Sequence, residues 1–295
     1  MDLAEHLKKI YDLNTERNRK ILLQIESINS ILSDEGIFPL YLKGSGQIID
    51  GLYNNAGERI LHDIDFLVKD EHFLKTAEIL QESGYHADIT YRPLENIKHY
   101  PALYSDDSPA FVEIHKRHVN RKFIKCFPVE SVFRDKIKPP GKDCFVMSDE
   151  HKIIQNFIHS QMEDDGHYYA RASLRSLYDL LLLSKRADPE ILLRNLGYYR
   201  RQSSGYLDIM YKSFGIIRPP EYEHSIHFHS FRHDINLKCK ICSKISYYFL
   251  KMVYSYIRKP LMAIQDKELR TDLFKKMTDR KWYGRHLGRF VKRPK

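Results

Sequence analysis

The expected fold follows from one stretch of the sequence, which has two parts: Leu40-Tyr41-Leu42-Lys43-Gly44-Ser45-Gly46 and Arg59-Ile60-Leu61-His62-Asp63-Ile64-Asp65-Phe66-Leu67-Val68. Its first part is a short apolar run that predicts a strand ending in a Gly-Ser-Gly turn. Its second part is another apolar run, which carries two aspartates one residue apart. Because alternate residues of a strand share a face, we expect Asp63 and Asp65 to point the same way.

Two carboxylates on one face repel each other unless a cation lies between them. Mg²⁺ prefers oxygen ligands of this kind. The Gly-Ser-Gly turn adds a second signal, because backbone N–H groups of such a turn, and of a helix that starts after it at Gln47, can bind phosphate. A cation next to a phosphate site is typical of nucleotide chemistry.

The flanking residues extend this stretch into an α+β domain. Residues 1–36 predict an N-terminal packing helix that ends at Gly36. Strand and helix patterns alternate over residues 37–120 and predict a mixed sheet with helices. The run Phe111–His115 alternates as a strand, which places Glu113 and His115 on one face.

The second half of the chain has a different pattern. Basic residues and Pro139-Pro140-Gly141 predict a linker over residues 121–147. Helical patterns then continue almost to the end, so residues 148–295 predict a helical C-terminal domain with a basic tail from residue 280. Contact of this tail with RNA is one expectation, because it combines Arg and Lys with Trp and Tyr.

Composition limits the class of protein. The chain has 295 residues, 42% hydrophobic residues and a formal net charge of +9, as in a globular protein that favours anionic partners. No apolar run approaches the roughly 18 residues of a membrane span, and the start lacks a signal-peptide pattern. Four cysteines are too few for a disulfide framework in a chain of this length. We therefore expect a cytoplasmic protein without a membrane span.

The order Gly44-Ser45, Asp63-x-Asp65, Glu113 resembles the DNA-polymerase-beta-like nucleotidyltransferase superfamily. The resemblance extends to the branch called the uncharacterised nucleotidyltransferase family through Leu42-Lys43-Gly44, Arg59, Asp63–Val68, His99, Val112–His115 and Leu174–Leu180. It covers residues 38–185 and implies a polymerase-beta-like nucleotidyltransferase core followed by a helical domain.

The resemblance also implies catalytic residues. In the superfamily, three carboxylates hold two Mg²⁺ ions that bridge the phosphates of an NTP. Here these metal ligands would be Asp63, Asp65 and Glu113. Two departures are visible: 17 residues separate Ser45 from Asp63, with an insertion over 51–59 that should form a loop, and the third carboxylate is Glu rather than the commoner Asp.

Other residues are assigned by the same resemblance. Gly44 and Ser45 would bind the phosphates through backbone N–H groups and the serine hydroxyl, and Lys43 or Arg59 would neutralise charge on the leaving pyrophosphate. The remaining candidates are His115 and His99 for acid–base work or acceptor binding, and Asp179, for which we expect a structural role as a cap or as a partner of Arg175.

The predicted function is Mg²⁺-dependent transfer of a nucleoside monophosphate from an NTP such as ATP to an acceptor, with release of pyrophosphate. The acceptor is a small molecule, a protein or an RNA end, and the sequence does not choose among them. Two alternatives remain: a catalytically degenerate nucleic-acid-binding or regulatory module, suggested by the charge of +9, and a toxin-like transferase acting on tRNA.

One further pattern lies outside this resemblance. The pair Cys239-Lys-Ile-Cys242 has the spacing of metal ligands, and histidines precede it at His224, His227, His229 and His233. Two cysteines and two histidines would hold zinc tetrahedrally. The same spacing also suits one helix face with both thiols buried, which we expect more.

Overall fold

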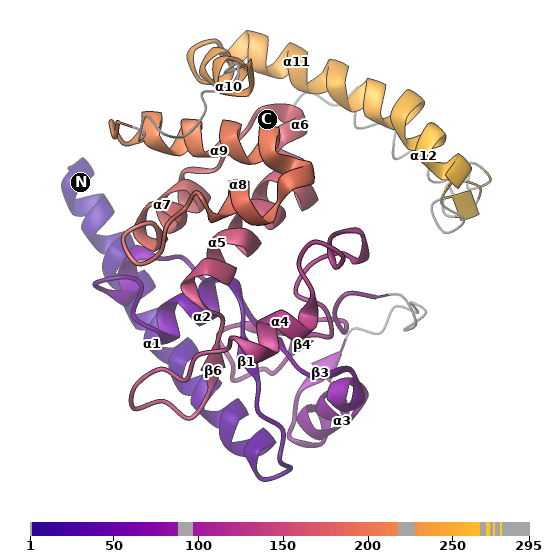
Figure 1. Ribbon diagram of the computed structural model, residues 1–295. Coiled ribbons are helices and arrows are strands. Elements are labelled where there is room, and N and C mark those ends of the chain that lie inside the picture. The colour runs from indigo at the N-terminus through magenta and orange to yellow at the C-terminus, as the bar shows by residue number, and fades with distance from the viewer. Residues whose placement is uncertain are drawn as a thin grey trace. The chain divides into compact units, whose positions relative to one another are not determined.

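The computed structural model describes residues 2–87, 97–217 and 228–265, together with residues 270, 271, 274 and 278 (Figure 1). By their internal contacts the residues form two compact units, Met1–Phe231 and Arg232–Lys295. The basic tail from residue 280 lies outside the described residues, as do His224 and His227 and residues 88–96 of the predicted α+β domain.

A long helix, α1 (Leu3–Ser33), opens the first unit. Ile21, Ile25 and Ile28 recur at spacings of four and three, and all three are buried in a cluster with residues of the sheet. The helix ends before Gly36, whose φ of 70° is a left-handed conformation that glycine adopts without steric cost. The helix predicted in residues 1–36 is therefore present and buries one face.

A mixed six-stranded sheet lies beside α1. Its strands are β1 (Leu40–Tyr41), β2 (Asp63–Leu67), β3 (His86–Ala87), β4 (Leu103–Tyr104), β5 (Phe111–His115) and β6 (Phe145–Val146). The spatial order is β3-β4-β5-β2-β1-β6. The pairs β2–β5 and β1–β6 are parallel, and the other pairs are antiparallel. This confirms the predicted mixed sheet, with β2 and β5 as neighbours.

The Gly-Ser-Gly segment differs from its prediction. Helix α2 (Lys43–Ile49) includes it, so the predicted turn is the first turn of a helix. Close packing explains both glycines: a Cβ at Gly46 would lie 2.6 Å from the carbonyl oxygen of Tyr41, and one at Gly44 would lie 2.6 Å from Cδ2 of Leu61. The glycines let α2 pack directly on the strands.

The insertion over residues 51–59 carries a short 3₁₀ helix, η1 (Ala56–Glu58). Two buried asparagines of α1 hold it in place, because the side-chain amide of Asn14 donates to the carbonyl oxygen of Gly57 at 2.8 Å and that of Asn18 donates to Arg59 at 2.6 Å. After β2 come a second 3₁₀ turn, η2 (Asp70–His72), and α3 (Phe73–Glu82), which agrees with the predicted helix.

Residues 121–147 carry elements of the first unit, which corrects the prediction of a linker. They contain η4 (Arg121–Phe123), α4 (Val129–Arg134) and the strand β6. The prolines and basic residues lie between these elements, while buried side chains such as Phe123, Val132 and Val146 join the cores. The apolar residues therefore outweigh the composition that suggested a linker.

The helical part of the first unit begins at α5 (Asp149–Phe157), capped by the hydroxyl of Ser148, which accepts from the backbone N–H of His151. The π-helical turn η5 (Ile158–Glu163) continues it. The later helices are α6 (Gly166–Tyr169), α7 (Leu174–Leu183), α8 (Ile191–Asn195), η6 (Gly197–Tyr199) and α9 (Arg200–Ser213).

One hydrophobic cluster joins the sheet to these helices. It contains Leu40, Leu42 and Leu67 from the sheet region together with buried residues of α5, α7, α8 and α9, such as Phe157 and Leu180. A second cluster lies between the sheet, α1 and α3. The predicted boundary between residues 37–120 and 148–295 thus runs through a shared core.

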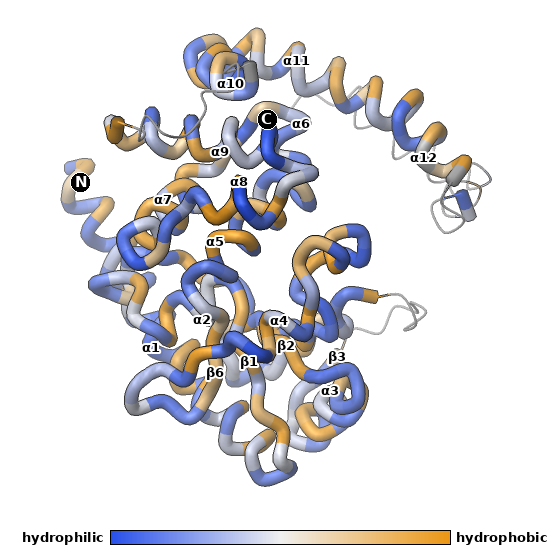
Figure 2. Tube along the Cα trace, in the orientation of Figure 1, coloured by the Kyte–Doolittle hydropathy of each residue, from blue (hydrophilic) through white to orange (hydrophobic). Residues whose placement is uncertain are grey.

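The second unit contains most of α10 (Phe228–Lys238), followed by α11 (Lys240–Val253), the π-helical turn η7 (Tyr254–Arg258) and α12 (Lys259–Gln265). Figure 2 shows apolar residues recurring along α11 and α12. Pro260 lacks an N–H, so residue 260 cannot donate the usual backbone hydrogen bond of an α-helix. The wider π-helical turn η7 ends two residues before this proline. In the described part of the chain, no helix is both long and apolar enough to cross a bilayer.

Candidate active site

The two central strands bring acidic residues together. In the parallel pairing of β2 with β5, Asp65 is the partner of Glu113 and Leu67 is the partner of His115. The His115 Nε2 atom lies 2.8 Å from Oδ1 of Asp65 and 3.4 Å from Oε2 of Glu113. One ligand atom from each of these three residues lies within 4.8 Å of the others, a potential metal site.

The donor set fits a divalent cation. Carboxylates are ligands for Mg²⁺ and Mn²⁺, whereas imidazole is a ligand more typical of transition metals. The predicted ligand Asp63 lies outside this close group, and His115 takes its place. Asp63 and Asp65 both line the cavity described below.

Lys43 supplies a cation to this group. Its Nζ atom lies 2.7 Å from Oδ1 of Asp65, and both side chains are largely buried. Burial alone would raise the pKa of Asp65, but the Lys43 ammonium and the His115 hydrogen bond hold that pKa well below its ordinary value. Burial likewise opposes the charge on Lys43, yet Asp65 raises the pKa of the lysine. Asp65 and Lys43 are therefore a charged pair.

The backbone of Lys43 is strained. Its φ of 47° lies in the left-handed region, which costs a residue with a Cβ about 1 kcal/mol or more. Its N–H donates to Oε1 of Gln155 on α5 at 3.1 Å. The side-chain pair with Asp65 and the Gln155 hydrogen bond thus hold an unfavourable backbone conformation at the centre of the site.

The pKa values of the other two carboxylates shift in opposite directions. Burial and the neighbouring Asp65 charge raise the pKa of Asp63, although Lys43 opposes the shift. The hydrogen bond with His115 lowers the pKa of Glu113 despite its partial burial. The side chain of Glu113 is 22% exposed, against 2% for Asp65, so Glu113 is the carboxylate of the close group that reaches solvent.

The hydroxyl of Ser45 makes hydrogen bonds within the protein. It is buried, donates to the carbonyl oxygen of Leu42 at 2.8 Å or of Asp65 at 3.0 Å, and accepts from the N–H of Asp65. These bonds fix α2 against β2 next to Asp65, while Gly44 lines the cavity. Contact of the serine hydroxyl with a nucleotide stays a prediction.

Arg59 is held by the helical part of the unit. Its Nη2 atom lies 3.2 Å from Oδ2 of Asp179 on α7, and the Tyr53 hydroxyl donates to the other carboxylate oxygen at 2.5 Å. Burial raises the pKa of Asp179, and the charge of Arg59 opposes that shift. Asp179 therefore has Arg59 and Tyr53 as its partners, rather than the predicted Arg175 or a helix cap.

His99 lies next to His115, a member of the potential metal site. Its ring centroid is 5.1 Å from that of His115, and its Nδ1 atom lies 2.9 Å from the carbonyl oxygen of Tyr100. Nearby, Nζ of Lys98 lies 2.7 Å from Oε2 of Glu163 in η5. Burial would raise the pKa of Glu163, but His159 and Lys98 lower it to about 2. This ion pair ties the β-sheet side of the site to η5.

A cavity of about 160 Å³ lies between β2, α2, α5 and α7. Three carboxylates line it, those of Asp63, Asp65 and Asp179, together with basic groups, namely Lys43, Arg59, Lys152, Arg175, His62 and His159. Lys152 is engaged already, since it contacts Asp50 and lies 2.8 Å from Asp149. For Arg175, an exposed residue, no ion pair is formed within the described residues. The cavity thus places positive charge opposite the acidic strand.

Sequence reasoning missed the helical wall of this cavity. Lys152, Gln155, Asn156 and His159 line it from α5 and η5. Their spacings of three, four and seven put them on one helix face, opposite Ile153, Ile154 and Phe157, which enter the core. A polar stripe on a helix with an otherwise buried face was the signal that could have found them.

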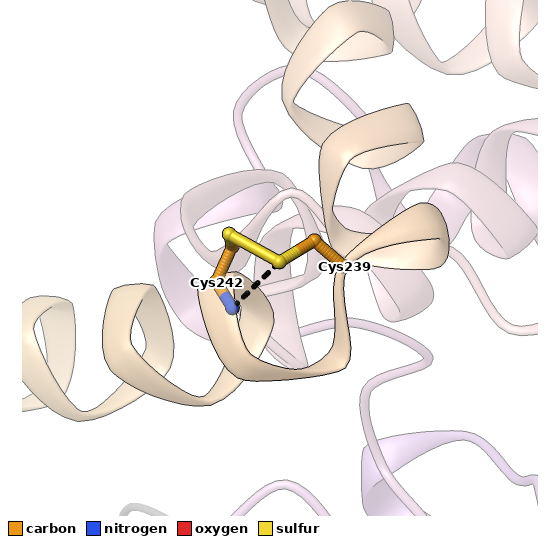
Figure 3. The surroundings of a disulfide bond; sticks show 2 residues. All are labelled: Cys239 and Cys242. Carbon is orange, nitrogen blue, oxygen red and sulfur yellow. Dashed lines mark hydrogen bonds between the residues drawn. A yellow bond between two sulfur atoms is a disulfide. The ribbon is translucent and has the colours of Figure 1, made fainter.

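The cysteine pair forms neither of the two arrangements considered from the sequence. Cys239 and Cys242 are joined by a disulfide at the start of α11, and the Cys239 sulfur accepts the backbone N–H of Cys242 (Figure 3). Neither thiol is buried, so the expectation of two buried thiols is also wrong. His229 lies instead against His167, with ring centroids 4.3 Å apart.

The fold and the acidic site can now be compared with known proteins. Residues 1–196 match the model of a family described as uncharacterised nucleotidyltransferase. The chain belongs to this family, which confirms the resemblance seen in residues 38–185. It is a nucleotidyltransferase by class.

Two solved structures are among those that match parts of this chain. The antibiotic-resistance factor ANT(2'')-Ia is 11% identical with a TM-score of 0.42, over 68% of this chain and 99% of that one. JHP933 from Helicobacter pylori is 14% identical with a TM-score of 0.37, over 86% of this chain and 97% of that one. At these TM-scores neither carries an argument about the site. No curated protein matches the chain.

Proposed function

We propose that this nucleotidyltransferase moves a nucleoside monophosphate from an NTP to an acceptor and releases pyrophosphate, using divalent cations held by Asp65, Glu113 and His115. The observation that carries the proposal is the pairing of Asp65 with Glu113 on adjacent strands, with His115 Nε2 2.8 Å from Asp65. Two Mg²⁺ ions, with Asp63 as a further ligand, remain our expectation from the family.

A bound divalent cation would act as a Lewis acid on the transferring phosphoryl group. The chain's own residues would do the rest. Lys43, Arg59 and Arg175 line the cavity and would bind the phosphates, with Arg59 oriented by Asp179. Glu113, ionised and partly exposed, would take the proton of the acceptor hydroxyl as general base.

Lys43 has a second consequence for binding. Its ammonium contacts the oxygen of Asp65 that also faces His115. A cation ligated there would repel the ammonium, and the triphosphate would offer it a new partner in the cavity. We therefore expect Lys43 to exchange Asp65 for the phosphates when metal and nucleotide bind together.

The test uses the full chain with each α-³²P-labelled NTP, Mg²⁺ or Mn²⁺, and a cell extract as the source of acceptors. We expect label to enter an acceptor, and Asp65→Asn and Glu113→Gln to reduce the rate by at least about 100-fold. Removing the metal with EDTA should have the same effect as these substitutions. Asp107→Asn is the matched control, because Asp107 is an exposed acid away from the site.

The result also separates the alternatives. Labelled tRNA together with growth arrest on expression, both lost in Asp65→Asn, would identify a toxin-like transferase. No labelling of any acceptor, together with RNA binding that Asp65→Asn leaves unchanged, would overturn the proposal in favour of a non-catalytic RNA-binding module. Contact of the basic tail with RNA and a cytoplasmic location stay predictions.

A further inference from the structure

The continuous helix formed by α11, η7 and α12 has an exposed apolar stripe. It spans 26 residues from Lys240 to Gln265, about 39 Å. Ile241, Ile245, Tyr248 and Met252 recur at spacings of four, three and four, which places them on one face, and all are exposed. Leu261 and Ile264 in α12 are exposed as well. A patch of this size on a protein surface marks an interaction site.

The charges of the same helix are of one sign. Residues 240–265 contain five cations, Lys240, Lys244, Lys251, Arg258 and Lys259, and no Asp or Glu. Lys240, Lys244 and Lys251 are spaced by four and seven, so they share a face beside the apolar stripe. An apolar face flanked by a cationic face is the pattern of helices that lie in the interface of a membrane.

We propose that the 240–265 helix binds the surface of a membrane rich in anionic phospholipids, with its apolar stripe among the acyl chains and its lysines at the headgroups. The cations complement the negative surface of such a membrane. The helix would lie on the membrane rather than cross it, since no helix among the described residues meets the requirements for a span.

Charge and apolar surface together favour lipid over two other occupants. A second copy of the chain would bring five cations toward five more, with no acidic residue in either helix. Nucleic acid would satisfy the cations but would leave the stripe from Ile241 to Met252 in water. An anionic membrane satisfies both faces at once.

The experiment is flotation of the full-length protein with vesicles of phosphatidylcholine, alone or with roughly a third phosphatidylserine. We expect binding only to vesicles with phosphatidylserine, and weaker binding as salt rises from about 0.1 M toward 0.5 M. Ile245→Gln with Met252→Gln should weaken binding at least ~10-fold, because both apolar side chains lose their transfer into lipid. A triple substitution to Gln should weaken vesicle binding about 100-fold; it changes Lys240, Lys244 and Lys251.

Matched controls use exposed residues of the first unit. Leu23→Gln with Leu74→Gln removes two exposed leucines, and Lys8, Lys9 and Lys185 changed to Gln remove three exposed lysines. Both variants should float like the wild type. Since flotation requires no catalysis, this result does not depend on nucleotidyl transfer.

Three outcomes would overturn the proposal. The first is the absence of binding to phosphatidylserine vesicles. The second is equal loss of binding in the matched controls. The third is binding of a single-stranded RNA, or self-association in sedimentation, that accounts for the effects of the helix variants while no vesicle binds.

Discussion

The two units of this chain differ in how the apolar faces of their helices are packed. The first unit has two buried clusters, one of which joins the sheet to helices α5–α9, although it also exposes some large apolar side chains, such as Leu23 and Leu74. Leu180 of α7 is fully buried, whereas Ile245 of α11 is 64% exposed. The first unit therefore contains packed apolar clusters, while the 240–265 helix exposes a row of apolar side chains within the described residues.

The largest effect is expected from a truncation that removes the helical half of the shared core. A chain that ends at residue 147 loses α5–α9, so Leu40, Leu42 and Leu67 lose their partners in the cluster. We expect it not to fold, as shown by the absence of a cooperative urea transition in far-UV circular dichroism. A chain that ends at residue 231 is the control and should keep a cooperative transition. A cooperative transition in the shorter chain would contradict the single shared core.

A single substitution in each unit compares how much a buried and an exposed apolar side chain contribute to the free energy of unfolding. Leu180→Ala removes a fully buried side chain and should lower the free energy of unfolding by about 2–5 kcal/mol. Ile245→Ala removes an exposed one and should change it by less than about 0.5 kcal/mol. Urea denaturation of both variants provides the measurement. Similar losses in the two variants would show that the 240–265 helix is packed within the folded chain.

A histidine tests whether the interior of the first unit behaves as an apolar medium. His118 is 1% exposed, and neither ring nitrogen has a hydrogen-bond partner in the described structure. Burial lowers the pKa of His118 to about 3, and the charges of Lys98 and His151 add to the shift, while Glu163 opposes it. The folded protein therefore holds this ring neutral.

The sign of the pH effect follows from this lowered pKa. As pH falls below the unfolded pKa of 6.5, the unfolded chain takes up the proton and the folded chain does not, so stability is lost on acidification until about pH 3. His118→Leu should remove that loss, and its stabilisation relative to wild type should grow by about 1.4 kcal/mol between pH 7.5 and 5.5. Urea transitions at the two pH values measure the change, and His6→Leu, at an exposed site, is the control. An unchanged difference between the two pH values would show that His118 titrates alike in both states.

The smallest expected effect concerns the backbone of the candidate active site. Because Lys43 has a φ of 47°, Lys43→Gly should give a protein about 0.5–1 kcal/mol more stable than Lys43→Ala. Lys20, within α1, provides the reverse case, since Ala there should be more stable than Gly by about 1 kcal/mol. Thermal unfolding of the four variants makes the comparison. The same order at both positions would mean that residue 43 is not strained.

Much of the fold followed from local patterns, because they are strong where one face is buried. The spacing of isoleucines predicted α1, and the alternation in residues 111–115 predicted β5 with Glu113 and His115 on one face. The Gly-Ser-Gly segment was predicted as a turn, but it is the start of a helix. Glycines are common both in turns and where a helix packs closely, and only the positions of Tyr41 and Leu61 distinguish the two cases.

The site was predictable as a set of residues rather than as an arrangement. Asp65 and Glu113 were expected, but the pairing that adds His115 depends on the parallel register of β2 and β5. The contact between Lys43 and Asp65 and the position of Gln155 depend on how α5 packs against the sheet. Tertiary contacts of this kind leave no mark at fixed sequence spacing.

The π-helical turn η7 has a consequence for the phase of the 240–265 helix. Met252 and Leu261 are nine residues apart, which is two and a half turns of a regular α-helix and would put them on opposite sides. The turn over Tyr254–Arg258 closes its hydrogen bonds one residue later, so it absorbs part of this offset and rotates Leu261 back toward the side of Met252. Deleting one residue from this turn would shift the phase of everything after it, so the two halves of the helix would face different directions.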